Sequence, residues 1–559
     1  MTDCDAVVVG TGPAGATAAE VLTAAGWSVI MLEKGRNHLL ALDAPFGPLG
    51  HVSNDEVKLL RRHFLGPDPW LEPRTFRRSE ADGERIHTGE VNNLPSTIGG
   101  GGFHADGKLP RFREIDFRLA SELGPVDGAD VVDWPLDYDE LEACYAEAER
   151  VIGVAGDHTA NPFAAWRSGP YPMLPGPDMF CAVLTSEAAG KLGYHPYRAP
   201  TGANSVEYDG RPACNNCGFC GYFGCPIEAK GDPVAPLRHA LRTGRCVILP
   251  ESYVTDIVLD GTGRRARGVR YLDAGGEGRE VAARTVIVGA GAFETPRLLL
   301  RSGIGNPDVV GRYLMYHFQT FALGIFPFRL HAHRGRSVTH LMDDPIVGDA
   351  EADAAARDAG LPWMRGGIVE HGGAGHPIME AVHLPFGPEH SRLMLRSPMR
   401  DRMAAFTMQG EDLPQASNRI DLDPHVTDTW GMPAGRVTYR SHAHEEVCAR
   451  HWAPRLEAVM REAGARHTFW ATSPPLEEHL AARPGVNPSP ISRHVMGTAR
   501  MGDDPRTSVC DRWQRLHDVE NVVITDSSVF PTSTGYGPTL TIVALAIRAT
   551  RALAGLDPL

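Results

Sequence analysis

The stretch DAVVVGTGPAGATAAEVLTAAGWSVIMLEKG, residues 5–35, decides the fold. A valine-rich strand leads into a glycine-rich turn, an alanine-rich helix follows, and a second apolar strand ends at Glu33. Gly10, Gly12 and Gly15 give the GxGxxG pattern: the first permits a tight turn, the second lets backbone approach a pyrophosphate, and the third lets helix and strand pack closely. This order predicts a Rossmann-type dinucleotide-binding unit at the start of the chain.

Glu33 narrows the choice of dinucleotide. It stands about 20 residues beyond the glycines, where a carboxylate accepts hydrogen bonds from the adenosine ribose hydroxyls. The same charge repels a 2′-phosphate, so FAD or NAD fits and NADP does not. Strand, helix and acid together favour dinucleotide binding over a glycine-rich turn that serves packing alone.

Composition indicates a soluble enzyme with more than one domain. The 559 residues, 42% of them hydrophobic and 22% charged, exceed what one hydrophobic core usually serves. The formal net charge of -14 argues against nucleic acid or an anionic membrane as partner. The sequence has no apolar run of about 18 residues and no export leader, which predicts a cytoplasmic protein without a membrane span.

A second strand, turn and helix pattern occupies residues 283–305, ARTVIVGAGAFETPRLLLRSGIG. It could form a separate nicotinamide site, but Glu294 stands where the third small residue should be. We therefore interpret Val286 to Val288 as a further strand of the first sheet. Residues 251–283 contain turn-forming DGTG and DAGGEG and are typical of hairpins that feed that sheet.

Several separated motifs, in the same order over about 540 residues, resemble the glucose-methanol-choline (GMC) oxidoreductases, and most of all the pyranose oxidase and gluconate dehydrogenase-like branches. The motifs are STIGGGGFHADGKLPRF (96–112), WPLDYDELEACYAEAERVIGVAG (134–156), GAGAFETPRLLLRSGIGN (289–306) with VGRYLMYH (310–317), HVMGTARMG (494–502), and NVVITDSSVFPTSTGYGPTLTIVALAIRAT (521–550).

The resemblance implies FAD as cofactor and a mixed α/β and α+β fold. A Rossmann-type FAD-binding domain is interleaved with an antiparallel-sheet substrate-binding domain, in the p-hydroxybenzoate-hydroxylase-like arrangement. The expected division is FAD-binding for residues 1–155, substrate domain with a Cys-rich loop for 156–235, FAD-binding for 236–318, substrate-binding for 319–490, and FAD-binding with the catalytic histidine for 491–559.

Four consecutive glycines, Gly99, Gly100, Gly101 and Gly102, suit a loop whose backbone lies against a flat ring or a phosphate. The alternative is a flexible linker. His104 follows, and in the related pyranose oxidases the aligned histidine is covalently attached to the flavin. Ala105 replaces the tryptophan that usually comes next, which favours a noncovalent flavin neighbour here.

The C-terminal segment also returns to the cofactor. By the resemblance, Asp526 contacts its central region, a helix starting near Thr539 points its N-terminus toward the isoalloxazine, and the strand residue at position 253, which is Tyr253 in this chain, lies nearby. A helix N-terminus stabilises the negative charge of a reduced flavin. Pro538 suits the first turn of such a helix.

Alcohol oxidation needs a base that takes the hydroxyl proton while hydride leaves the carbon. His494 occupies the position of the family's catalytic histidine in HVMGTARMG. The family normally has Asn or His immediately before the Pro-Thr of its last signature, but this chain has Gly537. Another group must then hold the substrate oxygen, and Tyr536 is the nearest candidate in sequence. Gly537 also keeps open a desaturase or a lyase on the same fold.

Cys214, Cys217, Cys220 and Cys225 follow C-x2-C-x2-C-x4-C spacing, one residue longer at its end than the bacterial ferredoxin run. Some GMC dehydrogenase subunits hold an iron-sulfur cluster in such a segment. The alternatives are structural zinc and cysteines without metal.

These observations predict FAD-dependent oxidation of an alcohol on a small molecule, with a sugar, an aminosugar or a glycosylated natural product favoured. The electron acceptor is oxygen or another, unidentified acceptor. The alternative is an iron-sulfur dehydrogenase subunit that passes electrons to a protein or quinone.

Overall fold

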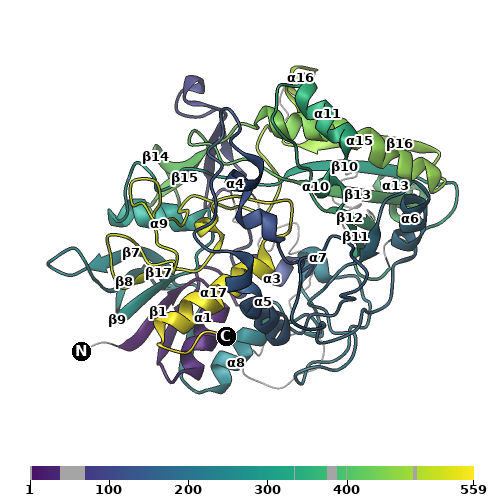
Figure 1. Ribbon diagram of the computed structural model, residues 1–559. Helices are drawn as coiled ribbons and strands as arrows, with labels where there is room; N and C mark the ends of the chain where they lie inside the picture. Colours follow the sequence, from purple (N-terminus) through teal and green to yellow (C-terminus); the bar gives the residue numbers. More distant parts are fainter. Residues whose placement is uncertain are drawn as a thin grey trace.

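The computed structural model describes residues 3–37, 69–92, 94–332, 334–373, 387–397, 399–482 and 487–559. Three β-sheets with helices packed around them organise this part of the chain (Figure 1). The largest sheet contains the N-terminal strand, the second is antiparallel, and the third is a small sheet of four strands.

The seven-stranded sheet holds the predicted Rossmann unit. Its central strand β1 (Cys4–Val9) pairs in parallel with β2 (Val29–Leu32) on one side and with β9 (Gly278–Val288) on the other. Residues 286–288 therefore add a strand to the first sheet, as the sequence indicated. The remaining strands are β6 (Cys246–Leu249), β7 (Tyr253–Leu259), β8 (Ala266–Leu272) and β17 (Val522–Ile524), in the order β6-β2-β1-β9-β8-β7 with β17 beside β9.

Helices from distant parts of the chain cover this sheet. Helix α1 (Pro13–Ala24) begins directly after the GxGxxG turn and buries its small residues, so it packs closely on the strands. The C-terminal helix α17 (Thr539–Leu553) lies beside α1 (Figure 1). The other helices of this region are α5 (Tyr138–Ile152), α8 (Val234–Arg242) and α9 (Glu294–Ser302).

The second sheet is antiparallel and has six strands. Along β10 (Phe318–Ile325) buried and half-buried residues alternate, so one face packs on helices and the other faces the interior of the molecule. The strand order is β16 (His467–Ser473), β10, β13 (Met403–Gly410), β12 (Val369–Gly373), β11 (Val338–Met342), β5 (Pro196–Arg198), and the packed helices are α6 (Phe180–Lys191), α11 (Ala350–Asp358) and α15 (Ala443–Glu462).

The third sheet joins β14 (Arg419–Thr427), β15 (Pro433–Thr438), β3 (Arg74–Arg77) and β4 (His87–Gly89). Short helical turns complete the described residues: η1 (Glu80–Asp82), α3 (Gly100–His104), η2 (Glu114–Phe117), α4 (Leu119–Leu123), α7 (Cys220–Phe223), α10 (Asp344–Val347), α13 (His390–Arg396), α14 (Met399–Arg402), α16 (Glu477–Ala482) and η3 (Ser527–Val529).

The fold class predicted from sequence is confirmed, because a Rossmann-type sheet and an antiparallel sheet occur together and the chain passes repeatedly between them. The glycine stretch differs from the predicted loop, since Gly100 begins the short helix α3 after Gly99 turns with φ +87°. Within the described residues, no helix is both long and apolar enough to cross a membrane.

Candidate functional site

A cavity of about 1320 Å³ runs from the GxGxxG turn to the inner face of the six-stranded sheet. Gly10 and Gly12 line one end, while His494 and Gly537 line the other. Sites for one small ligand usually measure about 300–1,000 Å³. The cavity therefore has room for a dinucleotide together with a substrate.

Thr11 organises the glycine turn. Its backbone N–H and its hydroxyl donate to Oε2 of Glu33, at 3.1 and 2.7 Å, and its Oγ1 accepts from the N–H of Gly99 at 3.0 Å. The N–H of Gly35 donates to Oε1 of Glu33 at 2.8 Å. Burial raises the pKa of Glu33, and these donors oppose that effect. Hydrogen bonds thus join Glu33, the GxGxxG turn and the second glycine segment, residues 99–102.

The second glycine segment lies against the first. A Cβ on Gly100 would stand 3.1 Å from the Cα of Gly12, and one on Gly102 would stand 2.5 Å from Cγ of Pro13. At Gly101 a Cβ would meet no protein atom within 4 Å, so this residue faces open cavity. Packing therefore requires glycine at position 102, while position 101 is left open for a ligand.

Lys230 fixes the position of His104. Its buried ammonium donates to the carbonyl oxygens of Gly102, Phe103 and Ala105, at 2.5, 3.0 and 2.6 Å, and so holds the end of α3. His104 is buried and lines the cavity. This places the histidine of the glycine motif at the cavity wall, where a flavin neighbour was expected.

Two buried acids offer acceptors to a ligand. Asp232 lines the cavity, and neither of its carboxylate oxygens has a hydrogen-bond partner within the described residues. Burial raises the pKa of Asp232 to about 6. Asp526 accepts from Thr295 Oγ1 at 2.6 Å and from the N–H of Gly291 at 2.9 Å, and also lines the cavity. An unpartnered buried carboxylate suits a hydroxyl-rich cofactor.

The N-terminus of α17 completes the cofactor end. Pro538 precedes the helix and Thr539 begins it, and both line the cavity. Its free N–H groups and dipole favour negative charge. Together with the glycine floor and the free acceptor at Asp232, these residues fit FAD.

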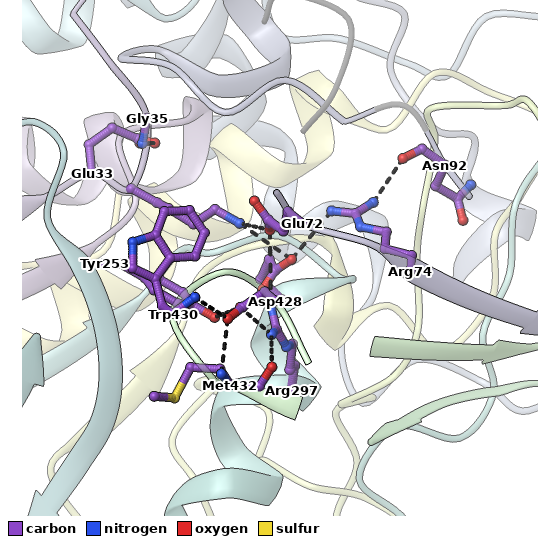
Figure 2. Close-up of polar contacts among 12 residues, drawn as sticks. Glu33, Gly35, Glu72, Arg74, Asn92, Tyr253, Arg297, Asp428, Trp430 and Met432 are labelled. Atoms are coloured by element: carbon purple, nitrogen blue, oxygen red, sulfur yellow. Dashed lines mark hydrogen bonds and ion pairs between the residues drawn. The ribbon is translucent and has the colours of Figure 1, made fainter. Parts of the chain in front are cut away.

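A buried ion network lies at the wall of the cavity around Lys34, Arg74 and Glu294 (Figure 2). Arg74 and Arg297 donate to the Glu294 carboxylate at 3.3 and 3.2 Å, and Lys34 lies 3.5 Å from it. Burial would raise the pKa of Glu294, but these three cations hold it well below its usual range. Glu294 thus stays ionised at the start of α9, in agreement with a turn that is not a second nucleotide site.

Residue 253, at the start of β7, is a tyrosine, and Val254 follows it. Both line the cavity. The hydroxyl of Tyr253 donates to Asp428 at 3.2 Å, and its ring contacts Trp430 with 5.0 Å between ring centroids (Figure 2). Tyr253 therefore belongs to the same supporting network.

His494 stands at the other end of the cavity, paired with a second histidine. The two Nδ1 atoms of His494 and His317 are 2.9 Å apart, and the rings meet edge to face. Burial, followed by the His317, Lys108 and Arg493 charges, lowers the pKa of His494 well below its ordinary value. A neutral imidazole at this position is able to accept a proton at neutral pH.

Gly537 leaves space beside this imidazole, since a Cβ there would lie 3.8 Å from Cε1 of His494. Tyr536 lies elsewhere. Its buried hydroxyl donates to Asp343 at 2.8 Å, and the residue does not line the main cavity. The structure therefore does not bring the Tyr536 hydroxyl to His494.

Strands β10, β12 and β13 of the six-stranded sheet, together with the segment that follows α3, supply a polar wall of the cavity. Lys108 lies 2.7 Å from Glu370 and 3.2 Å from Asp106. Gln409 donates to Glu370 at 3.2 Å, and Gln319 donates to Gln409 at 3.2 Å. All five line the cavity, so a substrate beside His494 meets carboxylates, amides and one ammonium.

The four clustered cysteines are free thiols outside this cavity. Burial raises the pKa of Cys217 and Cys225 and brings that of Cys220 to about 12. Among the described residues, no group of three or more His, Cys, Asp or Glu side chains could hold a metal ion. This arrangement of Cys214, Cys217, Cys220 and Cys225 does not fit an iron-sulfur cluster or zinc.

The cavity contains many of the residues indicated by the sequence and several that sequence reasoning missed. Gly15 and Gly99 contribute to packing behind it. His317, the histidine that contacts His494, ends the motif VGRYLMYH, so that motif was a signal that could have found it. The polar wall could have been sought in the alternate residues of β10, β12 and β13. The predicted residues at the cavity are Gly10, Gly12, Glu33, Gly100, Gly101, Gly102, His104, Tyr253, Asp526, Thr539, His494 and Gly537.

Fold and cavity define the chain as an FAD-dependent oxidoreductase, and comparison with known proteins agrees. A profile described as FAD binding domain matches residues 3–41, and the two GMC oxidoreductase profiles match residues 180–319 and 414–546. The 6'''-hydroxyparomomycin C oxidase of Streptomyces lividus is 31% identical, covering 98% of this chain and 91% of the relative. The chain belongs to the GMC oxidoreductase family.

Other similar proteins span the chain as well. Gluconate 2-dehydrogenase flavoprotein of Pantoea cypripedii is 27% identical over 98% of this chain and 93% of its own length. The crystal structure of pyridoxine 4-oxidase from Mesorbium loti shares the fold, with a TM-score of 0.58, 19% identity, and coverage of 99% of this chain and 100% of that one. The chain is accordingly an FAD-dependent enzyme that oxidises an alcohol group on a small molecule.

Proposed function

We propose that the enzyme oxidises an alcohol group of a sugar or aminosugar, with His494 as the base. His494 lines the same cavity as the glycine turn and the N-terminus of α17, and the proposal depends on this observation. FAD held there would supply the acceptor for the hydride that leaves the carbinol carbon. His494 takes the hydroxyl proton, so the CH–OH group loses two electrons and two hydrogens and becomes C=O.

The polar wall supports this substrate class. Glu370 and Asp106 place two carboxylates against the single ammonium of Lys108, which leaves net negative charge at the wall. Gln319 and Gln409 add amide donors and acceptors. Such a wall offers hydrogen-bonding groups to several hydroxyls and accommodates an amino group, whereas an apolar alcohol would make no use of these groups.

Anaerobic rapid mixing tests the base. Candidate substrates are paromamine, gluconate, fructose and 2-methyl-1,2-propanediol, the compounds in the names of relatives. We expect His494→Ala to bind FAD and to lower the rate of flavin reduction by about 10²- to 10⁴-fold, the usual contribution of a positioned base. Exposed His467 on β16 provides the matched control, and His467→Ala keeps the parental rate.

Reduction of His494→Ala at the parental rate would show that the base is wrongly assigned. Absence of flavin reduction with every alcohol and sugar tried, despite bound FAD, would instead favour the desaturase or lyase alternative raised by Gly537. These outcomes separate the residue's role from the type of reaction.

The route of electrons away from FAD has two candidates. Direct reoxidation by dioxygen gives hydrogen peroxide, and iron-free protein that forms peroxide is an oxidase. The alternative is another, unidentified acceptor, which the cysteines of residues 214–225 do not serve through a cluster, because their arrangement does not fit one. Protein that forms no peroxide in air, although its flavin is reduced anaerobically, would favour that acceptor.

We also propose a cytoplasmic location. All ten cysteines are free in the structure, which suits a reducing compartment.

A further inference from the structure

None of the sequence motifs assigns a function to His317, and backbone pairing places it beside His494. Met315 and Met496 form an antiparallel bridge, with N–H to carbonyl distances of 3.0 and 2.9 Å in the two directions. In an antiparallel pair, the residue two positions after one bridge residue lies opposite the residue two positions before the other. His317 and His494 occupy those positions.

The contact between the two rings leaves one nitrogen of His494 for chemistry. Nδ1 of His494 is 2.9 Å from Nδ1 of His317, so one of these atoms carries the hydrogen and the other accepts it. His317 is fully buried and does not line the cavity, whereas His494 does. Only Nε2 of His494 is therefore available to a substrate.

The surroundings of His317 indicate which atom carries the hydrogen. Gln409 donates its amide N–H to the carboxylate of Glu370, so its Oε1 is an acceptor for other partners. Gln409 and the backbone of Ser533 and Thr534 favour a proton on the His317 ring, against the burial that lowers its pKa to about 4. Nε2 of His317 makes no hydrogen bond of standard geometry within the described residues, but these acceptors lie beside the ring.

We propose that His317 is a positioning residue that accepts the Nδ1–H of His494 and thereby leaves Nε2 of His494 unprotonated toward the substrate. The hydrogen of His317 then lies on its Nε2. Gln409, which acts on the His317 ring, also donates to Glu370 of the polar wall at 3.2 Å. This proposal rests on the proposed role of His494 as base.

A direct test is the tautomer of His494. Nitrogen-15 NMR on protein labelled in histidine separates protonated from unprotonated ring nitrogens, and His494→Gln identifies the relevant signals. We expect Nδ1 of His494 to be protonated and Nε2 to be bare in the FAD-loaded wild-type enzyme. The opposite tautomer overturns the proposal, and this measurement needs no variant at position 317.

A kinetic test uses variants of His317. We expect His317→Phe to keep bound FAD and to lower the anaerobic rate of flavin reduction by about 10²-fold, because the neutral His494 then populates both tautomers and loses its fixed orientation. His317→Gln, whose amide oxygen accepts the Nδ1–H, recovers part of the lost rate. The matched control is His371→Phe: His371 is equally buried in the six-stranded sheet but does not line the cavity.

The pH profile separates positioning from loss of structure. The charged groups that act on His494 are His317, Lys108 and Arg493, and each lowers its pKa. Replacing His317 with phenylalanine removes both the acceptor of the His494 Nδ1–H and the charge that His317 carries once it is protonated, and it keeps the site buried, so we expect the acidic limb of the rate profile to move. His371→Phe leaves the limb in place.

An unchanged rate and an unchanged acidic limb in His317→Phe overturn the positioning role. If His494→Ala also retains the parental rate, the assignment of the base has failed, and not merely the role of His317. If only His317→Phe retains it, the base stands and the positioning role is wrong.

Discussion

At the scale of single residues, burial changes what His494 does. An exposed histidine is partly protonated near neutral pH, and the protonated form cannot accept a proton. Burial, followed by the effects of the nearby His317, Lys108 and Arg493, lowers the pKa of His494, so the neutral, basic form persists as the pH falls through the ordinary histidine range. Proton abstraction is then lost only at more acidic pH. The same burial explains why one hydrogen bond donated to His317 decides which nitrogen of His494 is left unprotonated toward the substrate.

Gly537 gives a residue-scale prediction about space. A Cβ at this position meets only Cε1 of His494, at 3.8 Å, which is ordinary van der Waals contact. We expect Gly537→Ala to fold and to bind FAD like the parent. Because its methyl group occupies the space beside the base, we expect the rate of flavin reduction at a fixed subsaturating substrate concentration to fall by about tenfold or more.

The neighbouring Gly535 is the matched control. Its Cβ would lie 2.6 Å from the Cα of Gly367, away from His494, so Gly535→Ala overpacks the interior. We expect it to lose about 1–3 kcal/mol of unfolding free energy. Parental kinetics in Gly537→Ala would contradict the assignment of this space to substrate.

At the scale of elements, the strand, turn and helix of residues 4–24 separate ligand binding from packing. A Cβ on Gly12 meets no protein atom within 4 Å, whereas one on Gly15 would stand 2.1 Å from the carbonyl oxygen of Gly10. The two glycines of this one motif are therefore needed for different physical reasons. Gly15 lets α1 approach the strand, and Gly12 leaves room for a ligand.

This difference predicts opposite results for two alanine variants. We expect Gly12→Ala to leave the stability of the apoprotein nearly unchanged and to weaken FAD binding tenfold or more, roughly 1.4 kcal/mol. Gly15→Ala is expected to cost about 1–3 kcal/mol of unfolding free energy through overpacking. Thermal unfolding of apoprotein and fluorescence titration with FAD measure the two effects. Equal FAD affinity in Gly12→Ala and the parent would contradict cofactor binding at this turn.

Local elements were predictable because their causes are local. The valine run, the glycine turn and the alanine-rich helix specify one another within about 30 residues, and Pro538 marked the start of α17. The glycine stretch was predicted less well. Its Gly100 begins a short helix because Lys230, 130 positions further along the chain, holds the carbonyl groups at the end of that helix.

At the scale of the whole molecule, the site is assembled from distant segments, and this limits prediction from sequence. His317 and His494 are 177 positions apart and meet through an antiparallel bridge that no local pattern encodes. Tyr536 illustrates the same limit in the other direction. It is adjacent to Gly537 in sequence, yet its hydroxyl binds Asp343 in another part of the interior. Family motifs pointed to His494 as the proposed base, but its contact with His317 and the polar wall required the tertiary structure.

One continuous core connects the two large sheets. It contains Val7 and Val286 of the seven-stranded sheet together with Val338 and Leu341 of the six-stranded sheet. Cofactor-facing residues come from the N-terminal turn, from the middle of the chain and from α17. A ligand that bridges these segments binds the folded state and has no site in the unfolded chain, so it stabilises the whole molecule.

The whole-molecule prediction is therefore one cooperative unfolding transition that moves with FAD concentration. Free FAD at 100 times its dissociation constant adds about 2.7 kcal/mol of stability, which for a chain of this length raises Tm by about 2 °C. Circular dichroism and tryptophan fluorescence should report the same shift. Gly12→Ala should need a higher FAD concentration to reach it. Two separate transitions, of which only one responds to FAD, would show that the sheets unfold independently despite their shared core.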